Sequence, residues 1–271
     1  MLKFIREITK RYFDGVKRKG PRHEYLLKEL KRRGCNPSLD KYGNIWVQKG
    51  SGNKVILYSS HVDVDPRIPH AKFKSYKSGR KRILSGVLDN SIGCYLNLLL
   101  AQEGPKRGRA IYIFTASEEA DKKNPRRFGL SAREVLKELK KRKITPDLCV
   151  AVDVTYPKLL TNAKRIEWHK EHHEIFDLKD PLHCYLDGYS NHKSKKIGSY
   201  FLRRFNSPHV SIRKLSGYDE AHVYRSIAPS FAFGPIVYGH FDRPNQKMPL
   251  IHAKTALKFL RKISEIPVKV N

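Results

Sequence analysis

The organisation of the chain follows from the stretch SGVLDNSIG at residues 85–93. This stretch carries one acidic residue, Asp89, between a glycine-containing loop and an apolar segment at residues 92–101. An apolar run that follows an acidic residue predicts a helix whose positive N-terminal end lies near the carboxylate. Asp89 would then face a cleft at the start of this helix. Aspartate is also common as a simple helix N-cap, so its role depends on acidic and histidine residues elsewhere in the chain.

Three predicted strands end in acidic residues or histidine. They lie at residues 55–58, 110–114 and 147–152, and they run into His61 and Asp63, into Glu118 and Glu119, and into Asp153. Open α/β sheets place ligands at the carboxyl ends of their strands, so His61 could bind a metal. The period of two in a strand puts Asp63 on the same side, where it could hold the imidazole. Adjacent carboxylates repel each other, and binding of a dication by Glu118 or Glu119 would leave the other free as a base.

The rest of the pattern alternates helices with strands. Predicted helices cover residues 2–13, 24–33, 131–143, 197–205 and 249–263, a short helix opens near residue 219, and further strands lie at residues 45–47, 210–212 and 230–234. The strands at 45–47 and 55–58 are typical of a hairpin-like pair, and Ser78-Gly79 predicts a hairpin tip in a basic rim loop. This alternation predicts an α/β fold with a doubly wound sheet.

Length and composition favour one reduced, intracellular domain. A chain of 271 residues with 39% hydrophobic content can bury one sizeable core, so we expect residues 1–271 to form a single domain. The sequence has no apolar run of bilayer length and no signal-peptide core, so no membrane association is expected. Its four scattered cysteines lack a Cys-x-x-Cys spacing, which favours a cytoplasmic protein.

The chain is strongly basic. It has 55 lysines and arginines against 26 acidic residues, a formal net charge of +29, and residues 67–82 and 193–214 each hold seven basic residues and no acidic one. Such density predicts attraction to anionic substrates or to polyanions. Zinc-finger spacing and RNA-binding aromatic motifs are absent from the sequence, so any contact with a nucleic acid would be electrostatic and made to its phosphate backbone. The alternative is a solvated basic face.

Taken together, these motifs resemble the co-catalytic di-zinc exopeptidases. This superfamily includes the leucine and tetrahedral aminopeptidases, the glutamate carboxypeptidases and the aminoacylases. The matching segments are SHVD at 60–63, GVLDN at 86–90, SEE at 117–119, VD at 152–153 and GH at 239–240. Further similarity at GPRHE (20–24), DKYGN (40–44), YD (218–219) and FGP (233–235) extends the resemblance over nearly the whole chain. The resemblance implies a three-layer α-β-α sandwich with a mixed, mostly parallel sheet. It also implies a zinc-dependent exopeptidase, most closely an aminopeptidase, that hydrolyses peptide bonds with a two-metal-activated water.

The resemblance also implies a role for each matching residue. It implies two Zn²⁺ ions per chain, which Co²⁺ or Mn²⁺ could replace. One ion would be held by His61, Asp89 and Asp153, and the other by Asp89, Glu119 and His240, so that Asp89 bridges them. Glu118 would be the general base, and Asp63 would support the histidine ligand. Tyr218 and Asp219 would contact the substrate. The Asp89-Asn90 peptide is expected to be cis.

The chain departs from the family in size, at one position and in its strong basicity, which bears on the class of substrate. The segments from His61 to Asp89 and from Asp153 to His240 leave no room for the lid or dimerisation domain that many members insert. We therefore expect a single catalytic domain. Gln246 stands where many relatives place a glutamate, at a position expected to lead into the final helix without affecting the metals.

Several alternatives remain open. His252 could replace His240 as the last ligand, but it is expected to be a partly exposed residue of the final helix. His169 and His172 could form a second metal site. The same catalytic site would also serve an N-acyl amino acid deacylase or a carboxypeptidase, so the substrate is a peptide or an N-acyl amino acid. A third interpretation is an inactive peptidase fold that acts as a basic polyanion-binding protein.

Overall fold

A large mixed sheet forms the centre of the protein. The computed structural model describes residues 1–12, 19–65, 72–119, 129–156, 181–188, 192–214, 219–239 and 245–265. Within these residues, eight strands form one sheet in the order β1-β2-β6-β3-β7-β10-β8-β9. The strands are β1 (Ser38–Leu39), β2 (Ile45–Gly50), β3 (Val55–His61), β6 (Arg109–Thr115), β7 (Leu148–Val152), β8 (Cys184–Gly188), β9 (Val210–Lys214) and β10 (Ser230–Pro235).

The middle of this sheet is parallel. Strands β6, β3, β7 and β10 run in the same direction, whereas β2 and β8 pair antiparallel with β6 and β10. The predicted mixed sheet is therefore confirmed. The predicted hairpin-like pairing of residues 45–47 with 55–58 is wrong, because β6 lies between β2 and β3. In this position β6 is hydrogen-bonded along both edges, as a buried strand requires.

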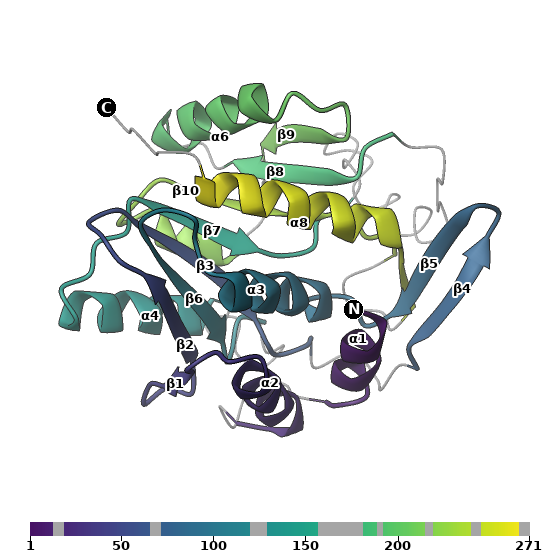
Figure 1. Ribbon diagram of the computed structural model, residues 1–271, viewed down its shortest axis with the longest axis horizontal. Helices are drawn as coiled ribbons and strands as arrows, with labels where there is room; N and C mark the ends of the chain where they lie inside the picture. Colours follow the sequence, from purple (N-terminus) through teal and green to yellow (C-terminus); the bar gives the residue numbers. More distant parts are fainter. Residues whose placement is uncertain are drawn as a thin grey trace, which may run out of the picture.

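Helices cover both faces of the sheet (Figure 1). They are α1 (Leu2–Thr9), α2 (Pro21–Arg32), α3 (Ser91–Glu103), α4 (Leu130–Lys141), α6 (His192–Phe205), α7 (Glu220–Tyr224) and α8 (Leu250–Glu265). Alternate strand residues enter different cores: Ile56 and Tyr58 pack in the core that includes α3 and α8, and Val55 and Leu57 in the core that includes α4. The fold is therefore the predicted three-layer α-β-α sandwich. Among the described residues, no helix combines the length and apolar character needed to cross a membrane.

A smaller three-stranded sheet supports the segment that carries Asp89. It consists of β4 (Lys74–Ser78), β5 (Lys81–Gly86) and β11 (Gln246–Pro249), in the order β11-β5-β4. The predicted turn at Ser78-Gly79 joins β4 to β5, and this hairpin extends away from the main sheet in Figure 1. Gln246 precedes the final helix, as expected, but it does so from within a strand. It lies in β11 opposite Gly86, because β11 supplies backbone partners along the free edge of β5.

Candidate metal centre

The predicted site residues meet at the carboxyl ends of the parallel strands. His61 is the last residue of β3, Glu118 and Glu119 follow β6, and Asp153 follows β7. Because these three strands are neighbours, their ends lie side by side. Asp89 reaches the same place from the segment between β5 and α3. The Asp89-Asn90 peptide is cis, as predicted.

A small residue lets the start of α3 approach β7 closely. Gly93 lies in the first turn of α3, and a Cβ at this position would overlap the Val152 carbonyl oxygen and the Asn90 side chain. The Asn90 side chain in turn donates to the Val152 carbonyl oxygen at 3.0 Å and accepts from the Gly93 amide at 2.8 Å. The absence of a side chain at residue 93 therefore brings Asp89 close to Asp153.

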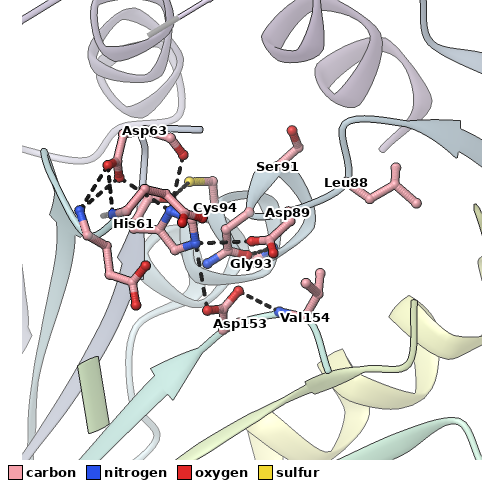
Figure 2. A network of polar contacts seen from close by, with 12 residues as sticks. His61, Asp63, Leu88, Asp89, Ser91, Gly93, Cys94, Asp153 and Val154 are labelled. Atoms are coloured by element: carbon pink, nitrogen blue, oxygen red, sulfur yellow. Dashed lines mark hydrogen bonds and ion pairs between the residues drawn. The ribbon is translucent and has the colours of Figure 1, made fainter. Parts of the chain in front are cut away.

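His61 lies at the centre of the site, with Asp63 on one side and Asp89 and Asp153 on the other (Figure 2). Its Nδ1 is 3.1 Å from the Asp63 carbonyl oxygen and 3.3 Å from Asp63 Oδ1. Its Nε2 is 3.1 Å from Asp89 Oδ1 and 3.7 Å from Asp153 Oδ2. A nitrogen that faces two carboxylates needs either a proton of its own or a cation between the groups. One nitrogen held by the protein and the other turned to the ligands is typical of a metal-binding histidine.

Asp63 also fixes the turn that carries the two glutamates. Its carboxylate accepts hydrogen bonds from the Glu118 amide at 3.1 and 2.9 Å and from the Glu119 amide at 3.0 Å. Asp63 is fully buried, so these bonds are shielded from water. One carboxylate thus positions both His61 and the Glu118-Glu119 turn.

Two groups of potential metal ligands share His61. One contains His61, Glu118 and Glu119, and the other contains His61, Asp89 and Asp153; in each group all ligand atoms lie within 4.8 Å of one another. The second group matches the ligands predicted for one zinc. Imidazole nitrogen and carboxylate oxygen are both ligands that Zn²⁺ accepts, so these residues fit a metal ion. His240 and Tyr218 lie outside the described residues, as do His169 and His172. The predictions for these four residues stay predictions.

Burial disfavours the charged forms of the acidic groups in this site. Burial raises the pKa of Glu118 well above its usual range. The nearby His61 lowers this pKa in part, and the carboxylates of Glu119 and Asp153 raise it further. Burial also raises the pKa of Asp153, and Asp89 adds to that increase. For His61, burial alone would lower the pKa, but the surrounding carboxylates, chiefly those of Asp153 and Glu118, raise it well above its usual value. A bound divalent cation would offset the repulsion between carboxylates that adds to the effect of burial on the acidic groups.

Asp89 makes further contacts that the sequence analysis did not predict. The Tyr156 hydroxyl donates to Asp89 Oδ2 at 2.8 Å. Gln246 Oε1 accepts from the backbone amides of Leu88 at 2.7 Å and of Asp89 at 2.9 Å. Tyr156, a few positions after β7, does not stand out in the sequence, and Gln246 was noted only as a departure from the family, far along the chain from Asp89.

A positive charge is buried beside the site. Arg22, at the start of α2, is 1% exposed and donates from Nη2 to Ser91 Oγ at 2.9 Å. Burial lowers its pKa, while the nearby thiol of Cys94 and the carboxylates of Asp63 and Asp89 act in the opposite direction. Arg22 belongs to the segment GPRHE that supported the family resemblance, and it offsets part of the negative charge of the cluster.

Another buried carboxyl group ties helix α7 to the strands that carry the site. Glu220 accepts from Ser59 Oγ at 2.6 Å and from the Thr115 hydroxyl, and Ser59 Oγ is 3.0 Å from the Tyr224 hydroxyl. Burial raises the pKa of Glu220, and the bonds to Ser59 and Thr115 lower it in part. The predicted substrate-binding residue Asp219 is the N-cap of α7, with its side chain accepting from the His222 amide at 3.1 Å.

His252 belongs to neither group of potential ligands. Its side chain is buried instead of partly exposed as expected, with Nδ1 2.9 Å from the Ile236 carbonyl oxygen and the ring stacked on His183 at 4.7 Å. The expectation was wrong because α8 turns this face onto the main sheet, where it contacts β8 and β10. Burial lowers the pKa of His252 to about 4.

The fold is shared with solved aminopeptidases. An aminopeptidase from the archaeon Desulfurococcus kamchatkensis is 11% identical with a TM-score of 0.71, over 98% of this chain and 95% of that chain. A TET aminopeptidase from a marine Thaumarchaeota archaeon is 11% identical with a TM-score of 0.69, over 96% of this chain and 95% of that chain. The Pyrococcus horikoshii TET1 peptidase can assemble into a tetrahedron or a large octahedral shell. It is 13% identical with a TM-score of 0.63, over 89% of this chain and 94% of that chain.

These similarities lie in the structure and not in the overall sequence. No family model and no curated protein matches the chain. At such identities the comparison establishes the fold, and the predicted resemblance to the di-zinc exopeptidases is confirmed at that level.

Proposed function

We propose that this protein is a zinc-dependent exopeptidase, most closely an aminopeptidase. The observation that carries the proposal is the convergence of one histidine and four acidic residues at the strand ends of an aminopeptidase fold. These residues are His61, Asp89, Glu118, Glu119 and Asp153. Their strand-end position is where open α/β sheets bind ligands, and their donor atoms suit Zn²⁺.

The proposed roles follow from the contacts of each residue. His61, Asp89 and Asp153 would hold one Zn²⁺, and Asp89, Glu119 and His240 the other. When bound, paired zinc ions polarise the scissile carbonyl and lower the pKa of a water molecule. Glu118 would take the proton of the attacking water and pass it to the leaving amine. Asp63 would hold His61 and the Glu118-Glu119 turn in place.

The surroundings of the site complete the proposal. Tyr218 and Asp219 would contact the substrate. Residues 1–271 would form a single catalytic domain without an inserted lid. A cytoplasmic location fits the four cysteines, which are all buried and free.

Zinc analysis combined with a peptide panel tests this function. We expect zinc in the purified protein, release of the first residue from peptides with a free amino terminus, and no release when that terminus is acetylated. Removal of zinc by a chelator should abolish activity, and Zn²⁺, Co²⁺ or Mn²⁺ should restore it.

The same panel separates the alternatives. Release from the carboxyl end would identify a carboxypeptidase, and cleavage of N-acyl amino acids a deacylase. A folded protein with neither zinc nor hydrolysis would contradict the proposal and favour an inactive, polyanion-binding fold.

The positive charge predicts a preference for acidic substrates. On the β4-β5 hairpin and the residues before it, six basic side chains are exposed: Lys72, Lys74, Lys77, Arg80, Lys81 and Arg82. Exposed charges act over a Debye length of about 8 Å at physiological salt, so their effect weakens as salt is added. We expect kcat/KM for a peptide rich in Asp and Glu to fall steeply between low and high salt, while that for a neutral peptide changes little.

Binding to heparin and DNA tests the other effect expected of the basic residues, which is attraction to polyanions. Retention that is lost at high salt would indicate that the basic surface holds the enzyme on a polyanion. Equal salt dependence for both peptides, with no retention on either matrix, would leave the basic residues as a solubilising surface.

A further inference from the structure

Both the side chain and the backbone of Asp89 are held by hydrogen bonds from outside the ligand groups. From this arrangement we propose that Tyr156 and Gln246 act together as positioning residues that orient Asp89 as the metal bridge. This inference rests on the proposed two-metal function. It replaces the expectation that the residue at position 246 does not affect the metals.

The two oxygens of the Asp89 carboxylate face different partners. Oδ1 lies 3.1 Å from His61 Nε2, and Oδ2 accepts the hydrogen bond of the Tyr156 hydroxyl at 2.8 Å. A carboxylate oxygen has two lone pairs, so the bond from Tyr156 leaves one lone pair of Oδ2 for a metal. Asp89 is 9% exposed, so few water molecules compete for this bond. Tyr156 thus limits rotation of the carboxylate without blocking its role as a bridge.

Gln246 fixes the backbone at the same residue. Its side chain is fully buried in β11, and Oε1 accepts from the amides of Leu88 and Asp89 at 2.7 and 2.9 Å. These two donors determine which end of the side-chain amide carries the oxygen. The nitrogen end is therefore directed toward Tyr156, with Nε2 at 3.4 Å from the hydroxyl oxygen.

The three residues form a directional chain of donors. Gln246 Nε2 donates to the Tyr156 oxygen, and the Tyr156 proton is then available to Asp89 Oδ2. A glutamate at position 246 could accept from the two backbone amides but could not donate to Tyr156 when ionised. It would instead attract the Tyr156 proton away from Asp89. The presence of glutamine at this position is thus explained by the tyrosine beside it.

Zinc affinity is the direct measure of this positioning. Hydrogen bonds to a ligating carboxylate typically contribute about 10- to 100-fold to metal affinity. We expect Tyr156→Phe to raise the Kd for zinc by about 10-fold or more, as measured by competition with a chromophoric chelator using zinc alone as the probe. The melting temperature of the metal-free protein should stay close to that of the wild type, because the ring and its packing remain.

A matched variant controls for the loss of a tyrosine hydroxyl. Tyr95 is buried in α3, where its ring lies 5.2 Å from that of Phe4. Tyr95→Phe should leave the zinc Kd unchanged. Equal zinc affinity for Tyr156→Phe and the wild type would overturn the inference. A wild-type protein that binds no zinc would instead overturn the proposed function itself.

A double-mutant cycle tests whether the two residues act as a unit. Gln246→Met removes the amide and keeps a side chain of similar length, and it should also weaken zinc binding. If Gln246 acts partly through Tyr156, the double variant should lose less affinity than the product of the two single losses. Strictly multiplicative losses would overturn the cooperation between the residues. If Gln246→Met does not fold, Tyr156→Phe alone still decides the role of Tyr156.

Discussion

Replacement of Glu118 by glutamine is expected to lower turnover by about 100-fold or more while zinc stays bound. Glutamine has nearly the same shape, but its amide cannot take a proton from water. The Glu118 amide is held by Asp63 through the backbone, so the substitution leaves this anchoring contact in place. The measurements are kcat at saturating peptide and the zinc content of the same preparation.

The prediction for Glu118 also separates a base from a ligand. Glu118 lies with His61 and Glu119 in a group whose donor atoms are within 4.8 Å of one another, a geometry that a metal ligand would share. Loss of zinc in Glu118→Gln would make Glu118 a ligand. Full activity with both zinc ions bound would show that another residue is the base.

A glutamate outside the site provides the control for Glu118→Gln. Glu138 lies in α4 and is largely buried, and its carboxylate accepts from Arg142 Nε at 3.0 Å on the same helix. Glu138→Gln makes the same chemical change away from the strand ends. It should leave both kcat and zinc content close to those of the wild type.

The parts of the site that could be predicted are those with a local signal. His61 ends an apolar strand, Glu118 and Asp153 come after one, and the carboxyl ends of parallel strands form the edge where open α/β sheets bind ligands. Because the strands are parallel neighbours, the local pattern was sufficient to bring these residues together. The cis peptide at Asp89-Asn90 followed from the resemblance to a family and has no signal in residue propensities.

The parts that could not be predicted depend on contacts between distant segments. Gln246 and Asp89 are 157 positions apart, and the bond between them exists because β11 pairs with β5 in one particular register. The position of β6 between β2 and β3 also depends on pairing across the chain, whereas hairpin signals are local. His252 was misplaced for a related reason, since the packing of α8 on the sheet decides which of its faces is buried.

Replacement of Asp89 by alanine is expected to release both zinc ions. As a bridge, the Asp89 carboxylate would contribute to both ions, and its two oxygens are turned to different sides, toward His61 and toward Tyr156. Without this carboxylate, each proposed zinc would lose a ligand. The negative charge that offsets the repulsion between the two ions would be lost as well. The wild type should carry two zinc ions per chain, and Asp89→Ala almost none, by metal analysis after dialysis.

The comparison with Asp153→Ala makes this prediction specific for a bridge. Asp153 belongs to the group of His61 and Asp89 but not to that of Glu118 and Glu119, so its loss should weaken one zinc and leave the other bound. Circular dichroism of both metal-free variants checks that the fold is retained. If Asp89→Ala keeps one zinc as tightly as Asp153→Ala does, Asp89 is a ligand of a single ion. The hydrogen bonds that surround Asp89 would then position a terminal ligand, and the two ions, if present, would have to be joined by another group.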